Sequence, residues 1–346
     1  MMKPITILST ACDGMFMPGF FRCLRENGER QVRIIGADMA AQPFMGGMID
    51  GFYQVPSYSD PHYIDILLDI CKRERVDIFF PHISMELPLV LDRLADFRAL
   101  GVKVAITDSQ TLNIANDKLR LYEHMRAHGL PTPEYYKIES GADLRACAPR
   151  LGYPERPVVV KLTQSSGSRG VRIVRAAIPR AERFLHSKPG SFDITLDEMC
   201  RTLDECDPLP TTIAMEYLPG CEYTVDLLAD HGRVLCIAGR RNYESRASIA
   251  MATYTEEKRG AYDLCRRIVE LLRLDGNIGF DFMLTDRDEP VLTDLNPRIT
   301  ATIVLYHRAG INFPYLRCKQ LLGEPFPHPT AAYGIRMKRK YLDLFE

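Results

Sequence analysis

Residues 276–303 constrain the fold of this chain more than any other segment. They contain two runs of strand-forming residues, 278–285 and 290–296, joined by the polar residues 286–289. Two such runs separated by four turn-forming residues are typical of a β-hairpin. Its apolar side chains share one face, which we expect to point into a core: Phe280, Phe282, Leu284, Val291 and Leu295.

Two aspartates face each other across this predicted hairpin. If Thr285 pairs with Pro290, Asp281 lies opposite Asp294, and Asn296 lies on the same face as Asp294 because side chains alternate along a strand. Carboxylates in such a cross-strand pair lie roughly 5 Å apart and repel each other, which favours a bound cation or a protonated acid. With no His or Cys nearby, Asp281, Asp294 and Asn296 are predicted to form an all-oxygen site that suits Mg²⁺ or Mn²⁺ rather than Zn²⁺.

Two other interpretations of the hairpin are less favoured. Both aspartates have apolar neighbours along the strand, which argues against a solvated hairpin with surface acids. The run 286–288 does not fit an EF-hand loop, because the sixth loop position lacks Gly and Pro297 stands where the twelfth-position Glu belongs. Mg²⁺ held by only one or two carboxylates takes its other ligands from phosphates and water, so the site predicts a phosphate-bearing ligand.

Composition narrows the class of protein. A chain of 346 residues is too long for one ordinary core and predicts two or three lobes. A net charge of −1 gives no support to a nucleic-acid or membrane partner, and no run of 18 apolar residues predicts a membrane span. The N-terminus lacks the apolar region of a signal peptide, and the ten cysteines form no C-x-x-C pair. We therefore expect reduced thiols and a cytoplasmic location.

Residues 1–108 alternate short apolar strands with helices, which predicts an open parallel α/β sheet with helices on both faces. The expected strands are 5–9, 32–37, 78–81 and 102–106, and the expected helices are 18–27, 62–75 and 87–100. The first turn is not G-x-G-x-x-G, and it is not a P-loop because Phe20-Phe21 stands where a P-loop has Lys-Ser or Lys-Thr. Asp38 follows the second strand as a ribose-binding acid would, which keeps a dinucleotide-dependent oxidoreductase as an alternative.

A loop rich in Ser and Gly, at 164–171, follows the predicted buried strand 157–161. Its backbone N–H groups and hydroxyls can wrap phosphate oxygens, and glycine lets the backbone approach them closely. Lys161 ends the strand and adds a point charge. Taken alone, the same loop also fits a flexible hairpin connection.

Three further features complete the candidate site. Residues 213–226 predict a strand, a Pro-Gly bend and a second strand that begins near Glu222, a carboxylate suited to ribose hydroxyls. Arg240 and Arg241 form a candidate anion clamp because the guanidinium fork matches carboxylate and phosphate, although a solvated edge is the alternative. Residues 113–129 predict one helix, in which Lys118 is, from the sequence alone, an ordinary solvated residue.

From about residue 110 onward the chain resembles the ATP-grasp superfamily, whose motifs it carries in order. Asp281 and the run Asp294-Leu-Asn296-Pro-Arg298 are similar to the metal-binding end of that family. Its nucleotide-binding segments resemble three stretches here: N-D-K at 116–118 with a G-x-P-x-P exit, the strand and loop 157–171, and E-Y-L-P-G-C-E at 216–222. The resemblance is to carboxylate–amine ligases and to the synthetase half-domain of carbamoyl phosphate synthase.

The resemblance implies roles for named residues. The metal ligands are Asp281, Asp294 and Asn296, with Asp281 in place of the Glu or Gln of many members. The residues that bind the nucleotide are Lys118, Lys161, Ser165, Ser166, Gly167, Glu216, Tyr217, Leu218 and Glu222. The catalytic residues beside the transferred phosphoryl group are Arg298, Lys161 and Arg241.

The resemblance also implies a domain order and an activity. A pre-ATP-grasp α/β domain at 1–108 precedes an ATP-grasp domain at 109–315, with a lid subdomain at about 132–212 and a C-terminal packing segment at 316–346. The expected activity is an ADP-forming ligase that uses ATP with Mg²⁺ or Mn²⁺ to convert a carboxylate to an acyl phosphate, which an amine captures. The alternatives are phosphorylation of bicarbonate or carbamate, and a nucleotide sensor without turnover. The expected partners are small molecules, with a homodimer left open.

Overall fold

The computed structural model describes residues 2–41, 47–165, 169–177, 179, 181, 184–185, 192–246 and 249–340. Its contacts divide the chain into two compact units. Unit 1 comprises Met1–Ala115, Glu222–Asp281 and Leu295–Glu346, and unit 2 comprises Asn116–Cys221 and Phe282–Asp294. This division reflects contacts within each unit and does not test the predicted domain boundaries at 108 and 315, which stay a prediction.

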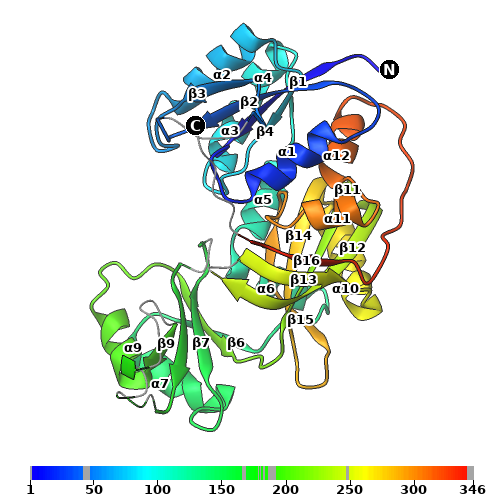
Figure 1. Cartoon of the computed structure of the whole chain (residues 1–346). Coiled ribbons are helices and arrows are strands. Elements are labelled where there is room, and N and C mark those ends of the chain that lie inside the picture. Colours follow the sequence, from blue (N-terminus) through cyan, green and yellow to red (C-terminus); the bar gives the residue numbers. More distant parts are fainter. Residues whose placement is uncertain are drawn as a thin grey trace. The chain divides into compact units, whose positions relative to one another are not determined.

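Unit 1 begins with a five-stranded parallel sheet in the order β3-β2-β1-β4-β5 (Figure 1). Its strands are β1 (Ile5–Thr10), β2 (Val32–Asp38), β3 (Gly51–Gln54), β4 (Ile78–Phe80) and β5 (Lys103–Val104). Its helices are α1 (Met17–Arg25), α2 (Tyr63–Glu74), α3 (Leu87–Asp92) and α4 (Leu94–Ala99). Ile7 packs in the core that contains α1, and its neighbour Leu8 packs in the core that contains α2 and α4. Both faces are therefore covered, which confirms the predicted open α/β domain.

Two details of this domain differ from the sequence prediction. The expected helix 87–100 is divided at Arg93 into α3 and α4, because the backbone of Arg93 leaves the helical region with φ −112° and ψ 17°. The short strand β3 was not among the expected strands, and none of its residues is fully buried.

The second sheet of the chain has six strands in the order β15-β14-β11-β12-β13-β16. These are β11 (Glu222–Asp230), β12 (Arg233–Arg246), β13 (Ile249–Thr255), β14 (Gly276–Leu284), β15 (Pro290–Asn296) and β16 (Arg336–Lys338). The helices α5 (Ser109–Ala115), α10 (Arg259–Leu272), α11 (Val304–Arg308) and α12 (Phe313–Leu321) accompany it in unit 1. In unit 1, α1 shares one apolar core with α11, α12 and residues of β11 and β12. The hairpin strands β14 and β15 are confirmed, and both continue into unit 2.

Unit 2 has a mixed five-stranded sheet in the order β6-β10-β7-β8-β9. Its strands are β6 (Tyr135–Ile138), β7 (Val158–Leu162), β8 (Val171–Arg175), β9 (Asp193–Thr195) and β10 (Thr212–Glu216). Its helices are α6 (Lys118–Ala127), α7 (Gly141–Cys147) and α9 (Leu196–Asp204). The apolar sides of α7 and α9 bury Leu144, Met199 and Leu203 against Val158 and Val160 of β7.

The predicted single helix 113–129 is wrong, because α5 ends at Ala115 and α6 begins at Lys118. Asp117 has extended backbone angles, and its carboxylate accepts from the backbone N–H groups of Leu119 and Arg120. This is the geometry of an N-cap, which starts a new helix rather than continuing an old one.

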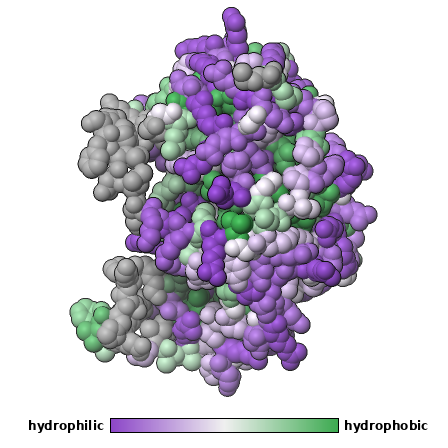
Figure 2. Space-filling model, turned by 45° about the vertical axis from the view of Figure 1, so that its right-hand side comes forward, coloured by the Kyte–Doolittle hydropathy of each residue, from purple (hydrophilic) through white to green (hydrophobic). Residues whose placement is uncertain are grey.

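Hydrophilic side chains predominate on the face drawn in Figure 2, with hydrophobic ones interspersed among them. Within the described ranges, no helix has both the length and the apolar character needed to span a membrane.

Candidate functional site

In unit 2, Lys118 is buried at the first turn of α6, with its side chain only 7% exposed. Its Nζ lies 3.4 Å from Oδ2 of Asp294 and donates to the carbonyl of Ser165 at 3.3 Å. Tyr122 lies four residues after Lys118 in α6, and its hydroxyl donates to the carbonyl of Thr293 at 2.8 Å. Residues four apart share one face of a helix, so α6 presents both side chains to β15. The solvated Lys118 expected from sequence alone is therefore wrong, and Asp294 lies beside a buried cation.

The first part of the predicted phosphate loop is held by two strands and a helix end. Lys161 lies on β7, opposite Val171 of β8 and Ile213 of β10. The hydroxyl of Ser165 donates to the carbonyl of Leu162 at 3.3 Å. The predicted nucleotide ligands Ser166 and Gly167 lie outside the described residues.

Asp117 joins this loop to α6. One of its carboxylate oxygens caps the helix, and the other accepts from Nε2 of Gln164 at 2.9 Å. The backbone N–H of Lys118 donates to the carbonyl of Thr163 at 3.1 Å. The helix end and the loop that are predicted to bind phosphate therefore form one hydrogen-bonded piece of unit 2.

The predicted adenine segment follows β10. Glu216 ends this strand, and its carboxylate accepts from the backbone N–H of Glu134 at 2.9 Å. The ring of Tyr217 lies 5.6 Å from the Arg175 guanidinium, and Leu218 is buried. The Glu216 side chain thus secures the edge of the sheet, which leaves the predicted contact with adenine to the backbone.

Gly220 forms the bend after this segment because no larger residue fits. Its N–H donates to the carbonyl of Leu284 at 2.9 Å. A Cβ at this position would lie 2.4 Å from that carbonyl oxygen. Close approach of two backbones, rather than a left-handed conformation, therefore explains the glycine of the E-Y-L-P-G-C-E motif.

In unit 1, the predicted metal ligand Asp281 contacts Asn296. Nδ2 of Asn296 lies 2.9 Å from Oδ2 of Asp281, and Oδ1 of Asp281 accepts from the Thr224 hydroxyl at 2.9 Å. Nη2 of Arg298 donates to Oδ1 of Asn296 at 3.3 Å. The structure therefore brings Asp281, Asn296 and Arg298 together. The predicted pairing of Asp281 with Asp294, which belong to different units, stays a prediction.

A buried network of hydrogen bonds and one ion pair is connected to Asp281 through the Thr224 hydroxyl. Nδ2 of Asn242 donates to the Thr224 hydroxyl at 3.2 Å, and Oδ1 of Asn242 accepts from Nε of Arg240 at 3.2 Å. Nη1 of Arg240 pairs with Asp226 at 2.6 Å in a site where both side chains are almost fully buried. Polar networks of this kind fix a unique geometry when every member has its partners. The Asp281 carboxylate is thus positioned by a hydrogen-bonded network that ends in the buried ion pair of Arg240 and Asp226.

The two adjacent arginines of β12 have different surroundings. Arg241 makes a two-contact ion pair with Glu256, with Nε at 2.7 Å and Nη2 at 3.0 Å from its carboxylate oxygens. Arg240 belongs to the buried network connected to Asp281. The sequence prediction named Arg241, not Arg240, as a catalytic residue. The signal that identifies Arg240 is the register of β11 and β12, which places it opposite Thr224. A catalytic role for Arg241 stays a prediction.

The predicted ribose ligand Glu222 begins β11. Its side chain is half-buried and accepts from the Ser245 hydroxyl at 3.0 Å. Thr224 and Asp226 lie two and four residues further along the same strand and are both buried. The first acid of the strand is therefore the accessible one.

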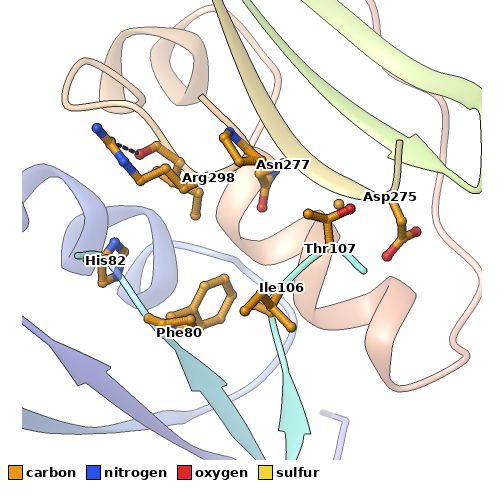
Figure 3. A pocket seen from close by; sticks show the side chains of 12 residues that line it. Phe80, His82, Ile106, Thr107, Asp275, Asn277 and Arg298 are labelled. Atoms are coloured by element: carbon orange, nitrogen blue, oxygen red, sulfur yellow. Dashed lines mark hydrogen bonds between the residues drawn. The ribbon is translucent and has the colours of Figure 1, made fainter. Parts of the chain in front are cut away.

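Arg298 also lines a small cavity in unit 1 that the sequence did not indicate (Figure 3). The cavity has a volume of about 10 Å³, close to that of one water molecule. His82 and Thr107 are among its lining residues, and neither Nε2 of His82 nor the hydroxyl of Thr107 has a hydrogen-bond partner among the described residues. Burial, and secondarily the charge of Arg298, lowers the pKa of His82 to about 3. His82 is therefore neutral at physiological pH.

One other group of side chains in the described part of the chain could share an ion. Asp230, His231 and Asp275 have ligand atoms within 4.8 Å of one another. However, Asp230 pairs with Arg233 at 3.2 Å and Asp275 pairs with Arg317 at 2.9 Å. We assign no ion to this group, whereas the oxygen-rich surroundings of Asp281 and Asn296 fit Mg²⁺.

Comparison with known proteins decides the family. Family models match two segments of the chain, "PylC-like, N-terminal domain" at residues 20–105 and "ATP-grasp in the biosynthetic pathway with Ter operon" at residues 208–340. Residues 208–340 belong to the ATP-grasp superfamily. The resemblance inferred from the hairpin and nucleotide motifs is thereby confirmed.

The matches with curated relatives cover only part of those proteins. The carbamoyl phosphate synthase large chain of Rubrobacter xylanophilus is 24% identical over 290 residues, which cover 81% of this chain and 26% of the relative. The D-alanine–D-alanine ligase of Chromohalobacter salexigens is 31% identical over 169 residues, which cover 45% of this chain and 46% of the relative. The matched region therefore spans less than half the length of either relative.

Solved structures share the ATP-grasp fold with this chain. The L-amino acid ligase from Bacillus licheniformis matches with a TM-score of 0.64 and 17% identity, covering 93% of this chain and 75% of that chain. Carboxyaminoimidazole ribonucleotide synthase from Aspergillus clavatus, complexed with ATP, matches with a TM-score of 0.68 and 16% identity, covering 95% and 80%. At these identities the likeness establishes the fold.

Proposed function

We propose that this ATP-grasp protein is an ADP-forming ligase that joins a carboxylate to an amine. The observation that carries the proposal is the linked set of Asp281, Asn296 and Arg298, in which an acid, an amide and a guanidinium lie within hydrogen-bonding distance. This set offers oxygen ligands for a hard cation next to a planar fork that suits a carboxylate or phosphate.

Asp281, Asp294 and Asn296 would hold Mg²⁺ or Mn²⁺, which supplies neutralisation of phosphate charge when bound. The chain's own residues then have distinct tasks. Lys118 and Lys161 bind phosphate oxygens as point charges, and Glu222 accepts hydrogen bonds from the ribose. Arg298 orients the substrate carboxylate. Catalysis by such a set consists of positioning and charge stabilisation, and needs no side-chain nucleophile.

The proposed reaction has two steps. A carboxylate oxygen forms a bond to the γ-phosphorus of ATP while the bond from that phosphorus to the β-phosphate oxygen breaks, which releases ADP. The amine nitrogen then attacks the acyl carbon, phosphate leaves, and the nitrogen loses a proton. The products are an amide, ADP and phosphate. The names of two similar proteins, a D-alanine–D-alanine ligase and an L-amino acid ligase, support this chemistry.

A second candidate is phosphorylation of bicarbonate or carbamate. It is favoured by the match to a carbamoyl phosphate synthase large chain, which covers 81% of this chain. Both candidates take small molecules as partners, and we place both in the cytoplasm because ten cysteines suit a reducing compartment. A homodimer stays an open proposal, which the mass of the protein in solution tests.

An ADP-release assay tests the function. The protein with Mg²⁺ and ATP is incubated with a library of carboxylic acids and amines, with bicarbonate as a separate arm. We expect ADP release that needs both an acid and an amine. Release with bicarbonate alone supports the second candidate, whereas ATP binding without ADP release in every arm contradicts both and supports a sensor.

Matched variants keep the assay specific to the site. Asp281→Asn removes one charge with almost no change of shape, and we expect a loss of about 100-fold or more in kcat. Asp263→Asn makes the same change at an exposed acid of α10, whose side chain is 72% exposed, and is expected to retain activity. Equal activity of the two variants contradicts the proposed role of Asp281.

A further inference from the structure

The parallel-sheet domain carries an apolar cleft of about 330 Å³ that the proposed chemistry does not use. Six of its lining residues are apolar or aromatic, namely Tyr58, Pro61, Ile64, Met85, Pro88 and Leu89, and the polar Ser59 and Asp60 complete the lining. Met85 is 55% exposed, so its side chain is accessible to a ligand in the cleft. Methionine is flexible and polarisable, and adapts to apolar groups of different shape.

The loop that follows β4 links the cleft to Arg298. Nε of Arg298 donates to the Ser84 hydroxyl at 3.0 Å, and Ser84 directly precedes Met85 in the connection between β4 and α3. Consecutive Cα atoms are only about 3.8 Å apart. One short loop therefore carries both the contact to the guanidinium and a wall of the cleft.

Glu86 holds this loop in place. It is fully buried, and its carboxyl accepts from the Thr10 hydroxyl at 2.6 Å, from the backbone N–H of Ile83 at 2.9 Å, and from the Tyr63 hydroxyl. Tyr63 precedes Ile64, which belongs to the opposite wall. Both walls are thus tied to one buried group, so the cleft is formed before any ligand binds.

We propose that the cleft receives the apolar part of the carboxylate substrate whose carboxylate Arg298 holds. This inference rests on the proposed ligase function and names its substrate class: a carboxylic acid with an aliphatic or aromatic group. The carboxylate of such a substrate would contact Arg298, and its apolar group would lie along Met85. The loop between β4 and α3 contacts Arg298 through Ser84 and lines the cleft through Met85. Bicarbonate, formate and acetate have no group that fills the cleft.

A series of straight-chain acids from acetate to octanoate tests the proposal in the ADP-release assay with a fixed amine. We expect kcat/KM for the acid to rise about fourfold for each methylene that the cleft buries. Met85→Glu should abolish this rise. Met39→Glu is the matched control, because Met39 is 60% exposed in the same domain and does not line the cleft.

Binding is measured separately from turnover. Protein labelled with ¹³C at the methionine methyl groups gives one signal for Met85, which is assigned by its absence in Met85→Leu. We expect octanoate to shift this signal and acetate to leave it unchanged.

The outcomes distinguish this inference from the function itself. ADP release that is independent of chain length, or that occurs with bicarbonate alone, overturns the cleft proposal while ATP-dependent activation stands. An unchanged Met85 signal with octanoate also overturns it. If no acid gives ADP, the ligase function fails, and with it the assignment of the cleft to a ligase substrate.

Discussion

At the scale of single residues, Gly220 shows how one backbone contact restricts a position in the nucleotide motif. We predict that Gly220→Ala lowers the free energy of unfolding by about 1–3 kcal/mol, because its Cβ would lie 2.4 Å from the carbonyl oxygen of Leu284 and force the two segments apart. Chemical denaturation measures the change. Gly260→Ala in α10 is the control, since nothing lies within 4 Å of its Cβ position. Alanine favours a helix, so this variant should be neutral or slightly more stable.

The buried His82 should make the free energy of unfolding depend on pH. Its pKa is lowered to about 3 in the folded state, against a value near 6.5 when unfolded, so acidification protonates the unfolded chain first. Its contribution to stability is complete above pH 6.5 and is lost as the pH falls toward 3. We expect wild type to lose about 1.4 kcal/mol per pH unit more than His82→Gln between pH 6 and pH 4.

Neighbouring charges do not obscure this comparison. Burial raises the pKa of Glu86, which makes acidification favour the folded state, and Arg298 keeps its charge throughout. Both residues are present in wild type and in His82→Gln, so the difference between the two proteins reports His82. Parallel pH profiles of the two unfolding free energies contradict the prediction.

At the scale of secondary structure, the hairpin and the alternating strands of the first domain were predictable because their apolar periodicity is strong. The interruption between α5 and α6 was not, because the residues around Asp117 fit a continuous helix and only the contacts of its carboxylate divide them. The sequence also did not show that Arg240 belongs to the buried network beside Asp281, and the catalytic role of Arg241 stays a prediction. Neighbouring residues of a strand point to opposite faces, and only the pairing with Thr224 shows which face holds the network.

The contact between α6 and β15 predicts the effect of removing a charge. Lys118→Met keeps the length and apolar part of the side chain but removes the ammonium beside Asp294 and, as proposed, from the ATP phosphates. We expect kcat/KM for ATP to fall about 100-fold. Asp294 is one-third exposed, so water compensates much of its lost partner and the protein should stay folded. Steady-state ADP release and thermal unfolding measure the two effects.

Lys137→Met is the control for this substitution. Lys137 lies on β6 of the same unit, and its side chain is 51% exposed beside Glu139. An exposed ion pair contributes little to stability, so both activity and thermal stability should match those of wild type. Comparable kinetic losses in the two variants, or wild-type kinetics in Lys118→Met, show that Lys118 has no special part in binding ATP.

At the scale of the whole molecule, ligand binding must appear as a gain in stability, since a ligand that binds only the folded chain shifts the unfolding equilibrium. ATP at one hundred times its Kd stabilises by about 2.7 kcal/mol. If Asp281, Asp294 and Asn296 hold the cation that accompanies ATP, a chelator should remove most of this gain, and Mg²⁺ should restore it. In Asp281→Asn the gain should be small with or without Mg²⁺, whereas Asp263→Asn should behave as wild type. Thermal unfolding with ATP, and with ATP plus chelator, measures these gains. A gain in wild type that the chelator leaves intact shows that ATP binds without the ion, which removes the cation from the proposed ligase mechanism.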